Sequence, residues 1–292
     1  MIDFERQLGA VASDMAASLD ILLPQPDGAE ARVLEAMRYA VMGPGKRFRA
    51  FLVMAGSAIF NLASNSATRV AAAVECLHAY ALVHDDLPAL DDAATRRGRP
   101  STHIAFDEPT AILAGDALLT FAFETLSAPE THPDPFLRSE LVLSLAKASG
   151  ARSLIGGQMI DVQAGQALDM GALMRLQRLK VGALFAFCCE AGAILARAPL
   201  AQRQALHAFA HDLSVAYQMA DELLKASSHG QGLRAQRDRE AGRPTFLAHL
   251  GEERTHSQSR LLAQQSVRHL EIFDSRADPL RAAAHYAVER RS

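Results

Sequence analysis

Apolar residues recur along most of the chain at three- and four-residue intervals, the spacing of one face of an α-helix. Each such segment is therefore expected to form a helix that buries its apolar face. Turn signals rich in Gly and Pro separate the segments, and no stretch of alternating polarity is long enough to predict a strand. The segments expected to be helical are 31–42, 47–60, 68–87, 110–127, 137–149, 172–197, 203–225, 244–250 and 257–274.

The composition agrees with a helical globular protein. Hydrophobic residues make up 49% of the 292 residues and charged residues 22%, and the strong helix formers Ala and Leu are abundant. The most apolar stretch, 181–196, is shorter than the roughly 20 residues of a membrane span and carries Glu190 in its middle, so we expect a buried helix there and no membrane span. With no repeat and no break in composition, the chain is predicted to be a single all-α domain over residues 1–292, a helical bundle.

The charge and the cysteines narrow the function classes. The formal net charge of −3 gives no basic field that would predict a nucleic acid partner. Cys76, Cys188 and Cys189 lie in apolar segments without the spacing of metal ligands, which is typical of buried thiols in a reducing compartment. The N-terminus lacks the features of a secretory signal, so a cytoplasmic protein is expected. The polar stretch 226–242 is expected to be a surface loop of the kind that often covers a functional site.

Four aspartates and three arginines crowd the segment "HDDLPALDDAATRRGR", residues 84–99. The helix expected over 68–87 ends at Pro88, so Asp85 and Asp86 fall in its last turn, where the helix dipole disfavours a carboxylate. Two carboxylates about 4 Å apart repel each other by roughly 4 kcal/mol at an effective dielectric constant of 20. A cation bound between them would remove this cost.

Mg²⁺ is the cation that fits the aspartates best, because it binds through a few carboxylates and a substrate phosphate and leaves Arg96 and Arg97 to bind phosphate. The alternative is a solvated turn in which the arginines neutralise the aspartates directly. A second basic cluster, "GPGKRFRA" at 43–50, favours phosphate binding. Lys46, Arg47 and Arg49 lie there at a Gly-rich turn that opens a helix, a setting that suits anions, although the cluster alone is weak evidence.

These motifs, taken in order, resemble the trans-isoprenyl diphosphate synthases, the polyprenyl synthetase family, and most closely its bacterial farnesyl diphosphate synthases. The resemblance covers about residues 30–250 and rests on "GPGKRFRA", "ECLHAYALVHDDLPALDDAATRRGRPSTH", "AILAGDALL", "GGQMIDV", "LKVGALF" and "YQMADELL". It implies an all-helical fold around a deep central cavity, a homodimer and a Mg²⁺-dependent enzyme. Such an enzyme condenses isopentenyl diphosphate with an allylic diphosphate to a short-chain product, expected here to be farnesyl diphosphate.

The resemblance also implies roles for individual residues. The Mg²⁺ ligands, for up to three ions, would be Asp85, Asp86, Asp91 and Asp221, and catalysis would depend on Asp85, Asp91, Lys180 and Asp221. The groups that bind diphosphate would be Lys180, Gln218, Arg96 on the allylic substrate, and Lys46, Arg49, His78 and Arg97 on isopentenyl diphosphate. Without the resemblance, His78 would be interpreted as a core histidine. Tyr80 and Ala81, five and four residues before Asp85, would form the floor of the chain-elongation cavity.

The second aspartate-rich motif departs from the family pattern. Where the family has DDxxD, this chain reads Asp221-Glu222-Leu223-Leu224-Lys225, so a base replaces the last acid. Asp221 and Lys225 lie four residues apart on the expected helix and could form a surface ion pair worth a few tenths of a kcal/mol. We therefore expect the Mg²⁺ ion bound through Asp221 to be held more weakly. Val181 stands where the family usually has a threonine after the helix lysine.

Three alternatives stay open at this point. A catalytically weak or inactive family member, acting as a diphosphate-binding or partner subunit, would explain departures confined to one half of the site. A metal phosphohydrolase would use the pairs His84-Asp85 and His211-Asp212, although no further His or Asp lies at suggestive spacing. A terpene cyclase would share the ionisation chemistry but would need no second diphosphate site at Lys46, Arg49 and Arg97.

Overall fold

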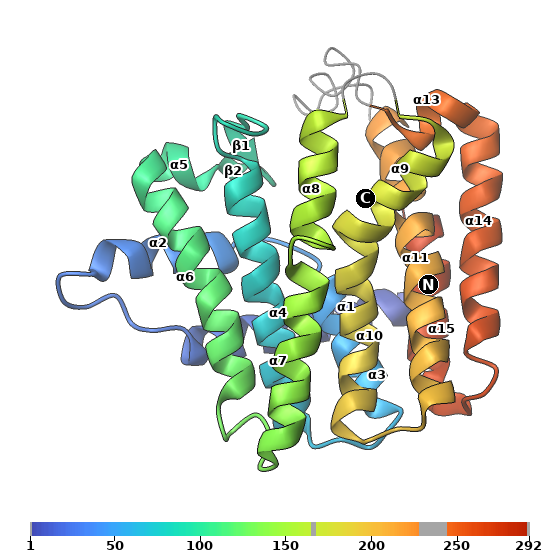
Figure 1. The fold of residues 1–292 in the computed structure, drawn as a ribbon, viewed down its shortest axis with the longest axis horizontal. Coiled ribbons are helices and arrows are strands. Elements are labelled where there is room, and N and C mark those ends of the chain that lie inside the picture. Colours follow the sequence, from blue (N-terminus) through green and yellow to red (C-terminus); the bar gives the residue numbers. More distant parts are fainter. Residues whose placement is uncertain (1, 165–167, 228–243, 291–292) are drawn as a thin grey trace. The chain divides into compact units, whose positions relative to one another are not determined.

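The computed structural model describes residues 2–164, 168–227 and 244–290, and these residues are almost entirely helical (Figure 1). The all-α prediction is confirmed. The described chain divides into two compact units. The N-terminal unit comprises Ile2–Met54 and Leu62–Val142, and the C-terminal unit comprises Ala55–Asn61 and Leu143–Ser292. Helices α3 (Phe48–Ala58) and α7 (Pro135–Ser149) contribute residues to both units, and the single domain over 1–292 stays a prediction.

The long helix α4 (Ser64–Asp85) is the centre of the N-terminal unit. Helices α1 (Ile2–Leu22), α2 (Ala31–Val41) and α6 (Glu108–Ser127) all pack against it, and the short helix α5 (Thr102–Ala105) leads into α6. Every residue of α4 from 70 to 77 is buried, as expected for a helix that is apolar on all sides. Because other helices pack against α4, its last residue, Asp85, lies at the end of a well-supported helix.

A small β-hairpin follows α4, although the polarity pattern predicted no strand. Strand β1 (Thr95–Arg96) pairs antiparallel with β2 (Arg99–Pro100), and Arg97 and Gly98 form the two-residue turn between them with positive φ angles of 52° and 78°. Positive φ at both turn residues belongs to the mirror-image turns whose twist matches paired strands. Each strand is two residues long, too short for alternating polarity to reveal it.

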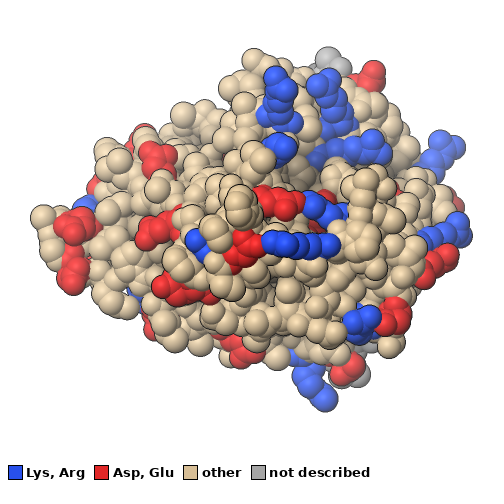
Figure 2. Space-filling view, turned by 60° about the horizontal axis from the view of Figure 1, so that its bottom comes forward, with Lys and Arg blue, Asp and Glu red and all other residues tan. Residues whose placement is uncertain are grey.

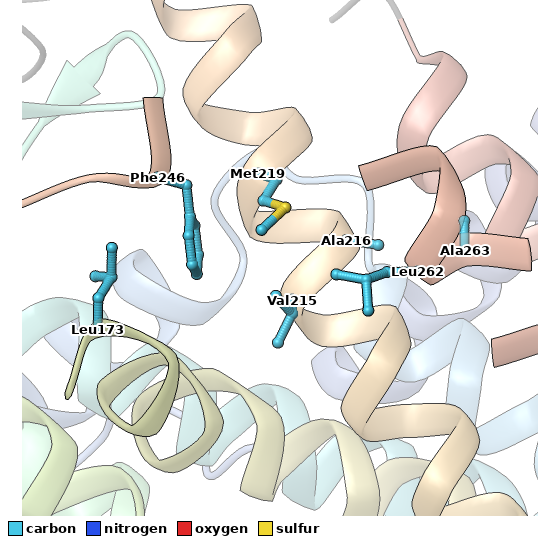
Figure 3. Close-up of a cluster of buried hydrophobic side chains, with 7 residues drawn as sticks. All are labelled: Leu173, Val215, Ala216, Met219, Phe246, Leu262 and Ala263. Carbon is cyan, nitrogen blue, oxygen red and sulfur yellow. The ribbon is translucent and has the colours of Figure 1, made fainter. Parts of the chain in front are cut away.

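In the C-terminal unit, α11 (Leu200–Ser227) is the central helix. It packs against α10 (Ala183–Leu195), α14 (Glu252–His269) and α15 (Asp278–Glu289). A buried cluster joins α11 to α14, to α9 (Met170–Gln177) and to α13 (Phe246–Leu250) (Figure 3). In this cluster α11 runs between Leu173 and Phe246 on one side and Leu262 and Ala263 on the other. The 3₁₀ turn η2 (Ser275–Ala277) precedes α15.

The helix expected over 172–197 is not continuous. It consists of α9, a π-helical turn η1 (Arg178–Gly182) and α10. The apolar α10 is buried as predicted, and Cys76, Cys188 and Cys189 are buried free thiols. Among the described residues, four further helices were not predicted: α1, α5, α8 (Leu154–Gln163) and α15.

Helix α6 is long and apolar enough to cross a membrane by length and composition. Half of its apolar window is buried inside the fold, and α6 packs along α4 and α2, which is typical of a core helix. On the face drawn in Figure 2, both kinds of charged side chain, Lys and Arg as well as Asp and Glu, are exposed, in line with the small net charge.

Candidate active site

The backbone after α4 brings the two ends of the first acidic motif together. Asp85 is the last helical residue, and the chain then turns back so that the Asp91 N–H donates to the Asp85 carbonyl oxygen at 2.9 Å. The N–H of Ala93 donates to the Asp86 carbonyl oxygen at 3.1 Å, which closes the same turn. Asp85 and Asp91 therefore lie on one short loop at the end of a buried helix.

Arg96 on the hairpin neutralises the two adjacent aspartates. Its Nε donates to Asp86 Oδ2 at 2.6 Å, its Nη2 donates to Asp86 Oδ1, and Nη2 lies 3.7 Å from Asp85 Oδ2. The side chains of Asp85 and Asp86 are only 9% and 4% exposed, which argues against the solvated turn. Within the described ranges, no three acidic, histidine or cysteine side chains converge on a position for a metal ion.

His78 lies on α4, two turns before Asp85. The arginines near it come from the Gly-rich turn, from α3 and from the hairpin. Arg49 Nη1 lies 3.2 Å from His78 Nε2. Burial, and then the charges of Arg49, Arg97, Arg96 and Arg47, hold the pKa of His78 well below its usual 6.5. His78 is therefore neutral, and its Nε2 accepts a hydrogen bond from the Arg49 guanidinium. We call these four arginines around His78 the arginine cluster. Arg47 pairs with Glu75 and Arg96 with Asp86, so Arg49 and Arg97 are the members best placed to meet an anionic ligand.

The Gly-rich turn and the hairpin meet at Arg97. Arg97 Nη1 donates to the Pro44 carbonyl oxygen at 2.9 Å, and a Cβ at Gly45 would collide with the same guanidinium. A side chain at position 45 would therefore push this guanidinium aside. Arg97 itself has a positive φ, an unusual conformation for a long side chain and one that often marks functional loops. Lys46, on the same turn, is exposed.

Arg47, which the sequence places with Lys46 and Arg49 in a basic cluster suited to an anion, has a structural role instead. Its Nη1 pairs with Glu75 Oε2 at 2.9 Å and its Nη2 donates to the Val41 carbonyl oxygen at 2.6 Å, with both side chains of the pair buried. The other oxygen of Glu75 accepts from the Ala50 N–H at 3.2 Å. This buried ion pair fastens the Gly-rich turn and the start of α3 to the middle of α4. The sequence did contain a signal for this pair, because an acid such as Glu75 inside an apolar helix needs a buried partner.

The residues expected at the cavity floor lie one turn before the motif on α4. The Tyr80 ring packs edge-on against His84 with centroids 4.9 Å apart, and Ala81 lies four residues before Asp85, on the same face. Tyr80 is buried, and burial followed by the charge of Asp116 raises its pKa. Within the N-terminal unit, a cavity of about 60 Å³ is lined by residues that include Tyr39, Leu82, Val83, Asp86, Arg96 and Arg97.

In the C-terminal unit, glycines hold the π-helical turn that carries Lys180. A Cβ at Gly157 of α8 would lie 2.5 Å from the Lys180 backbone nitrogen, and a Cβ at Gly182 would lie 3.0 Å from Ser214 Oγ on α11. The turn is thus wedged between α8 and α11, and Lys180 Nζ donates to Asp161 Oδ2 at 2.5 Å. Sequence reasoning had assigned no role to Asp161, although it lies in the quoted motif "GGQMIDV".

The second acidic motif forms an ion cluster near the end of α11. Asp221 Oδ2 pairs with Lys225 Nζ at 2.7 Å, as predicted from their spacing, and Asp221 Oδ1 lies 3.4 Å from Arg290 Nη2. Glu222 is buried, accepts from the Leu247 N–H at 3.0 Å, and burial raises its pKa to about 7. Gln218 is half-buried and lies three residues before Asp221 on the same helix. Arg290 follows α15, far beyond the recognised motifs, so no signal pointed to it.

The His-Asp pairs of the phosphohydrolase alternative make unrelated contacts. His84 Nε2 lies 3.0 Å from the Ile112 carbonyl oxygen, His211 contacts His207, and Asp212 pairs with His269. The described residues thus hold no His-Asp metal group of that kind. The expected lid loop, 226–242, lies almost wholly outside the described residues.

A family model described as polyprenyl synthetase matches residues 30–272 of the chain. The chain belongs to the polyprenyl synthetase family. A curated family member, the farnesyl diphosphate synthase of Escherichia coli (strain K12), is 37% identical over 99% of this chain and 99% of its own length. Geranylgeranyl pyrophosphate synthase 11 of Arabidopsis thaliana is 33% identical over 99% of this chain and 82% of its own length. A crystal structure of an FPP/GFPP synthase from Zymomonas mobilis matches with a TM-score of 0.89 and 43% identity, covering 98% of this chain and 99% of that chain.

These comparisons confirm the predicted family, the isoprenoid synthase fold and the enzyme class, a short-chain trans-prenyltransferase. They give no support to the alternative of an inactive partner subunit. The names of the relatives differ in the product that they specify, from farnesyl to geranylgeranyl diphosphate. The family match therefore does not determine the length of the product, which depends on this chain's own residues.

Proposed function

We propose that the protein condenses isopentenyl diphosphate with an allylic diphosphate, in a Mg²⁺-dependent reaction, and that its product is farnesyl diphosphate. The arginine cluster carries this proposal. Two of its members, Arg49 and Arg97, lie near a neutral His78 and suit an anion, and the buried pair Asp85 and Asp86 lies two turns further along the same helix. A diphosphate with a bound cation accounts for both features at once.

When bound, Mg²⁺ neutralises the diphosphate leaving group and weakens its bond to the allylic carbon. Asp85 and Asp91 fit such an ion, because their oxygen atoms suit Mg²⁺ and the Asp91–Asp85 backbone hydrogen bond fixes the turn that carries them. Asp86 fits less well, because Arg96 binds both of its carboxylate oxygens. Asp85 and Asp91 are therefore the proposed ligands, with Asp86 holding Arg96 in place.

The remaining groups have distinct roles in the proposed reaction. Arg49 and Arg97, with Lys46, bind isopentenyl diphosphate, and His78 fixes the orientation of the Arg49 guanidinium by accepting its hydrogen bond. Arg96 binds the allylic diphosphate. In the C-terminal unit, Asp161 holds the Lys180 ammonium group in position for a diphosphate oxygen, and Gln218 contributes a polar contact.

We propose in addition a cytoplasmic homodimer. Free, buried thiols at all three cysteines are typical of a reducing compartment. Helix α6 exposes two adjacent large apolar residues, Ile112 and Leu113, at 43% and 58%. Exposed apolar surface of this kind is typical of a contact with another chain, and a second copy is the partner that the resemblance implies.

The proposal is tested by incubating purified protein with Mg²⁺, isopentenyl diphosphate and geranyl diphosphate and analysing the products by chromatography. We expect farnesyl diphosphate, formed only when both substrates and Mg²⁺ are present. Hydrocarbon product without isopentenyl diphosphate would instead favour a terpene cyclase. If folded protein turns over no allylic substrate, the proposal is wrong.

The same assay tests the cavity floor. Tyr80→Ala removes a buried ring one turn before the motif, so we expect products longer than farnesyl diphosphate. Tyr286→Ala, which removes a buried tyrosine from α15, outside the proposed substrate site, is the control and should leave product length unchanged. An unaltered distribution in Tyr80→Ala would place the floor elsewhere.

A further inference from the structure

Two cations of the chain itself already occupy the carboxylate of Asp221. Lys225 Nζ lies 2.7 Å from one oxygen, and Arg290 Nη2 lies 3.4 Å from the other. Lys225 lies on α11 itself and Arg290 directly follows α15, so both contacts lie within the C-terminal unit. Each oxygen of the carboxylate thus faces a positive charge without any bound ion.

The Arg290 contact is built into the fold. Its side chain is 3% exposed, its guanidinium lies over the Tyr217 ring at 3.8 Å from the centroid, and its Nη1 donates to the Ala287 carbonyl oxygen. A guanidinium does not lose its proton in a protein, so this charge is permanent. Tyr217 is one turn before Asp221 on α11, and its ring holds Arg290 beside the carboxylate.

The neighbouring acid cannot replace Asp221 as a ligand. Glu222 is buried, and its carboxylate accepts from the Leu247 N–H on α13. The fifth position of the motif is Lys225. The described part of the motif therefore offers one carboxylate, and that carboxylate faces two cations, which is a poor donor set for a divalent ion that prefers several oxygen ligands.

We propose that the second motif of this enzyme binds no Mg²⁺ and that the Lys225 ammonium group, positioned by Asp221, takes the place of that ion toward the diphosphate. This inference rests on the proposed prenyl transfer. Asp221 is then a positioning residue for Lys225 and Arg290 rather than a metal ligand. The sequence had suggested a weakened Mg²⁺ site here; the contacts of Asp221 argue for its replacement.

The test counts bound metal. Mn²⁺ serves as the probe for Mg²⁺, in the presence of inorganic diphosphate, and bound Mn²⁺ per chain is measured by electron paramagnetic resonance. We expect Asp221→Asn to bind as many ions as the wild type, and Lys225→Asp to bind one more. Lys225→Gln, which removes the charge without adding a ligand, is the matched control and should gain none. Loss of an ion, or affinity weaker by about tenfold or more, in Asp221→Asn would overturn the inference.

A second measurement needs no metal. In the presence of a chelator, Asp221→Asn should lower the melting temperature, because it leaves the buried Arg290 guanidinium without its carboxylate. The control Asp278→Asn breaks an exposed pair with Arg281, in which the aspartate side chain is 65% exposed, and should have a smaller effect. If Asp221 served only as a metal ligand, its carboxylate would not stabilise the metal-free protein. An unchanged or raised melting temperature in Asp221→Asn would therefore contradict the inference.

Failure of this inference can be told from failure of the proposed function. The proposed function predicts that Asp85→Asn weakens Mn²⁺ binding in the presence of diphosphate, whatever happens at Asp221. If Asp85→Asn has no effect, the proposed function is wrong. If Asp85→Asn weakens binding and Asp221→Asn does so as well, only the inference about the second motif is wrong.

Discussion

His78 illustrates how neighbours give a single residue its role. A histidine in an apolar helix is usually a core residue, but this imidazole receives a hydrogen bond from Arg49 and lies within the fields of Arg47, Arg96 and Arg97. Burial contributes most to the low pKa of His78, and the four arginines add to it. A neutral imidazole can accept the bond from Arg49, whereas a protonated one would repel the cluster.

The low pKa of His78 predicts a pH-dependent stability. Below pH 6.5 the unfolded chain binds a proton at His78 that the folded chain does not, so the folded state loses stability as the pH falls from 6.5 toward the lowered pKa. His78→Gln keeps an acceptor for Arg49 but does not titrate. We therefore expect its melting temperature to depend less on pH between about 5 and 7 than that of the wild type. Parallel pH profiles of the two proteins would contradict a neutral His78.

At this scale, sequence reasoning works where neighbours along the chain determine the chemistry. The crowding of Asp85 and Asp86 at a helix end was visible in the sequence, and both side chains are buried beside Arg96 as an electrostatic argument would require. Partners distant in the chain could not be found this way. Arg290 reaches Asp221 across 69 positions, and nothing near either residue indicates the contact.

The elements show where hydrophobic periodicity is informative and where it is not. It located α4 and α11, because long helices with buried faces repeat the same spacing many times. It could not locate the π-helical turn, because one wide turn barely disturbs the spacing across 172–197. The hairpin could not be predicted either, since strands of two residues are too short to show an alternating pattern.

The glycine contact at the π-helical turn gives a prediction for this element. Gly157→Ala places a methyl group 2.5 Å from the Lys180 backbone nitrogen, so α8 and the turn must move apart. We expect a lower melting temperature and lower activity, because Lys180 is displaced from Asp161. Thermal unfolding and the prenyl transfer assay measure the two effects.

Gly9→Ala is the matched control for that substitution. Gly9 lies inside α1 with no atom within 4 Å of an added Cβ, so alanine should stabilise the helix by about 1 kcal/mol or less. Equal effects of the two substitutions would mean that close packing at Gly157 does not position Lys180.

At the scale of the whole molecule, the composition and the family match both indicate a helical enzyme. The proposed homodimer requires a contact surface on this enzyme. The N-terminal unit places α6 against α4 and α2 with one side buried. The exposed Ile112 and Leu113 lie early in this helix, and Leu113 is 58% exposed. Burial of a leucine side chain contributes about 2 kcal/mol, so covering such residues in a dimer would be a sizeable gain.

We therefore expect a homodimer in solution and expect Leu113→Asp to shift it toward monomer, because a carboxylate at this position would be desolvated in the contact. Molar mass from light scattering after size-exclusion chromatography measures the shift, and circular dichroism verifies that the helices persist. The control is Ile21→Asp, at a residue of α1 that is 82% exposed and outside α6. A wild type that is monomeric at micromolar concentration would refute the homodimer. A dimer that survives Leu113→Asp would place the contact on another face, because an unpaired charge at the centre of an interface weakens binding by several kcal/mol.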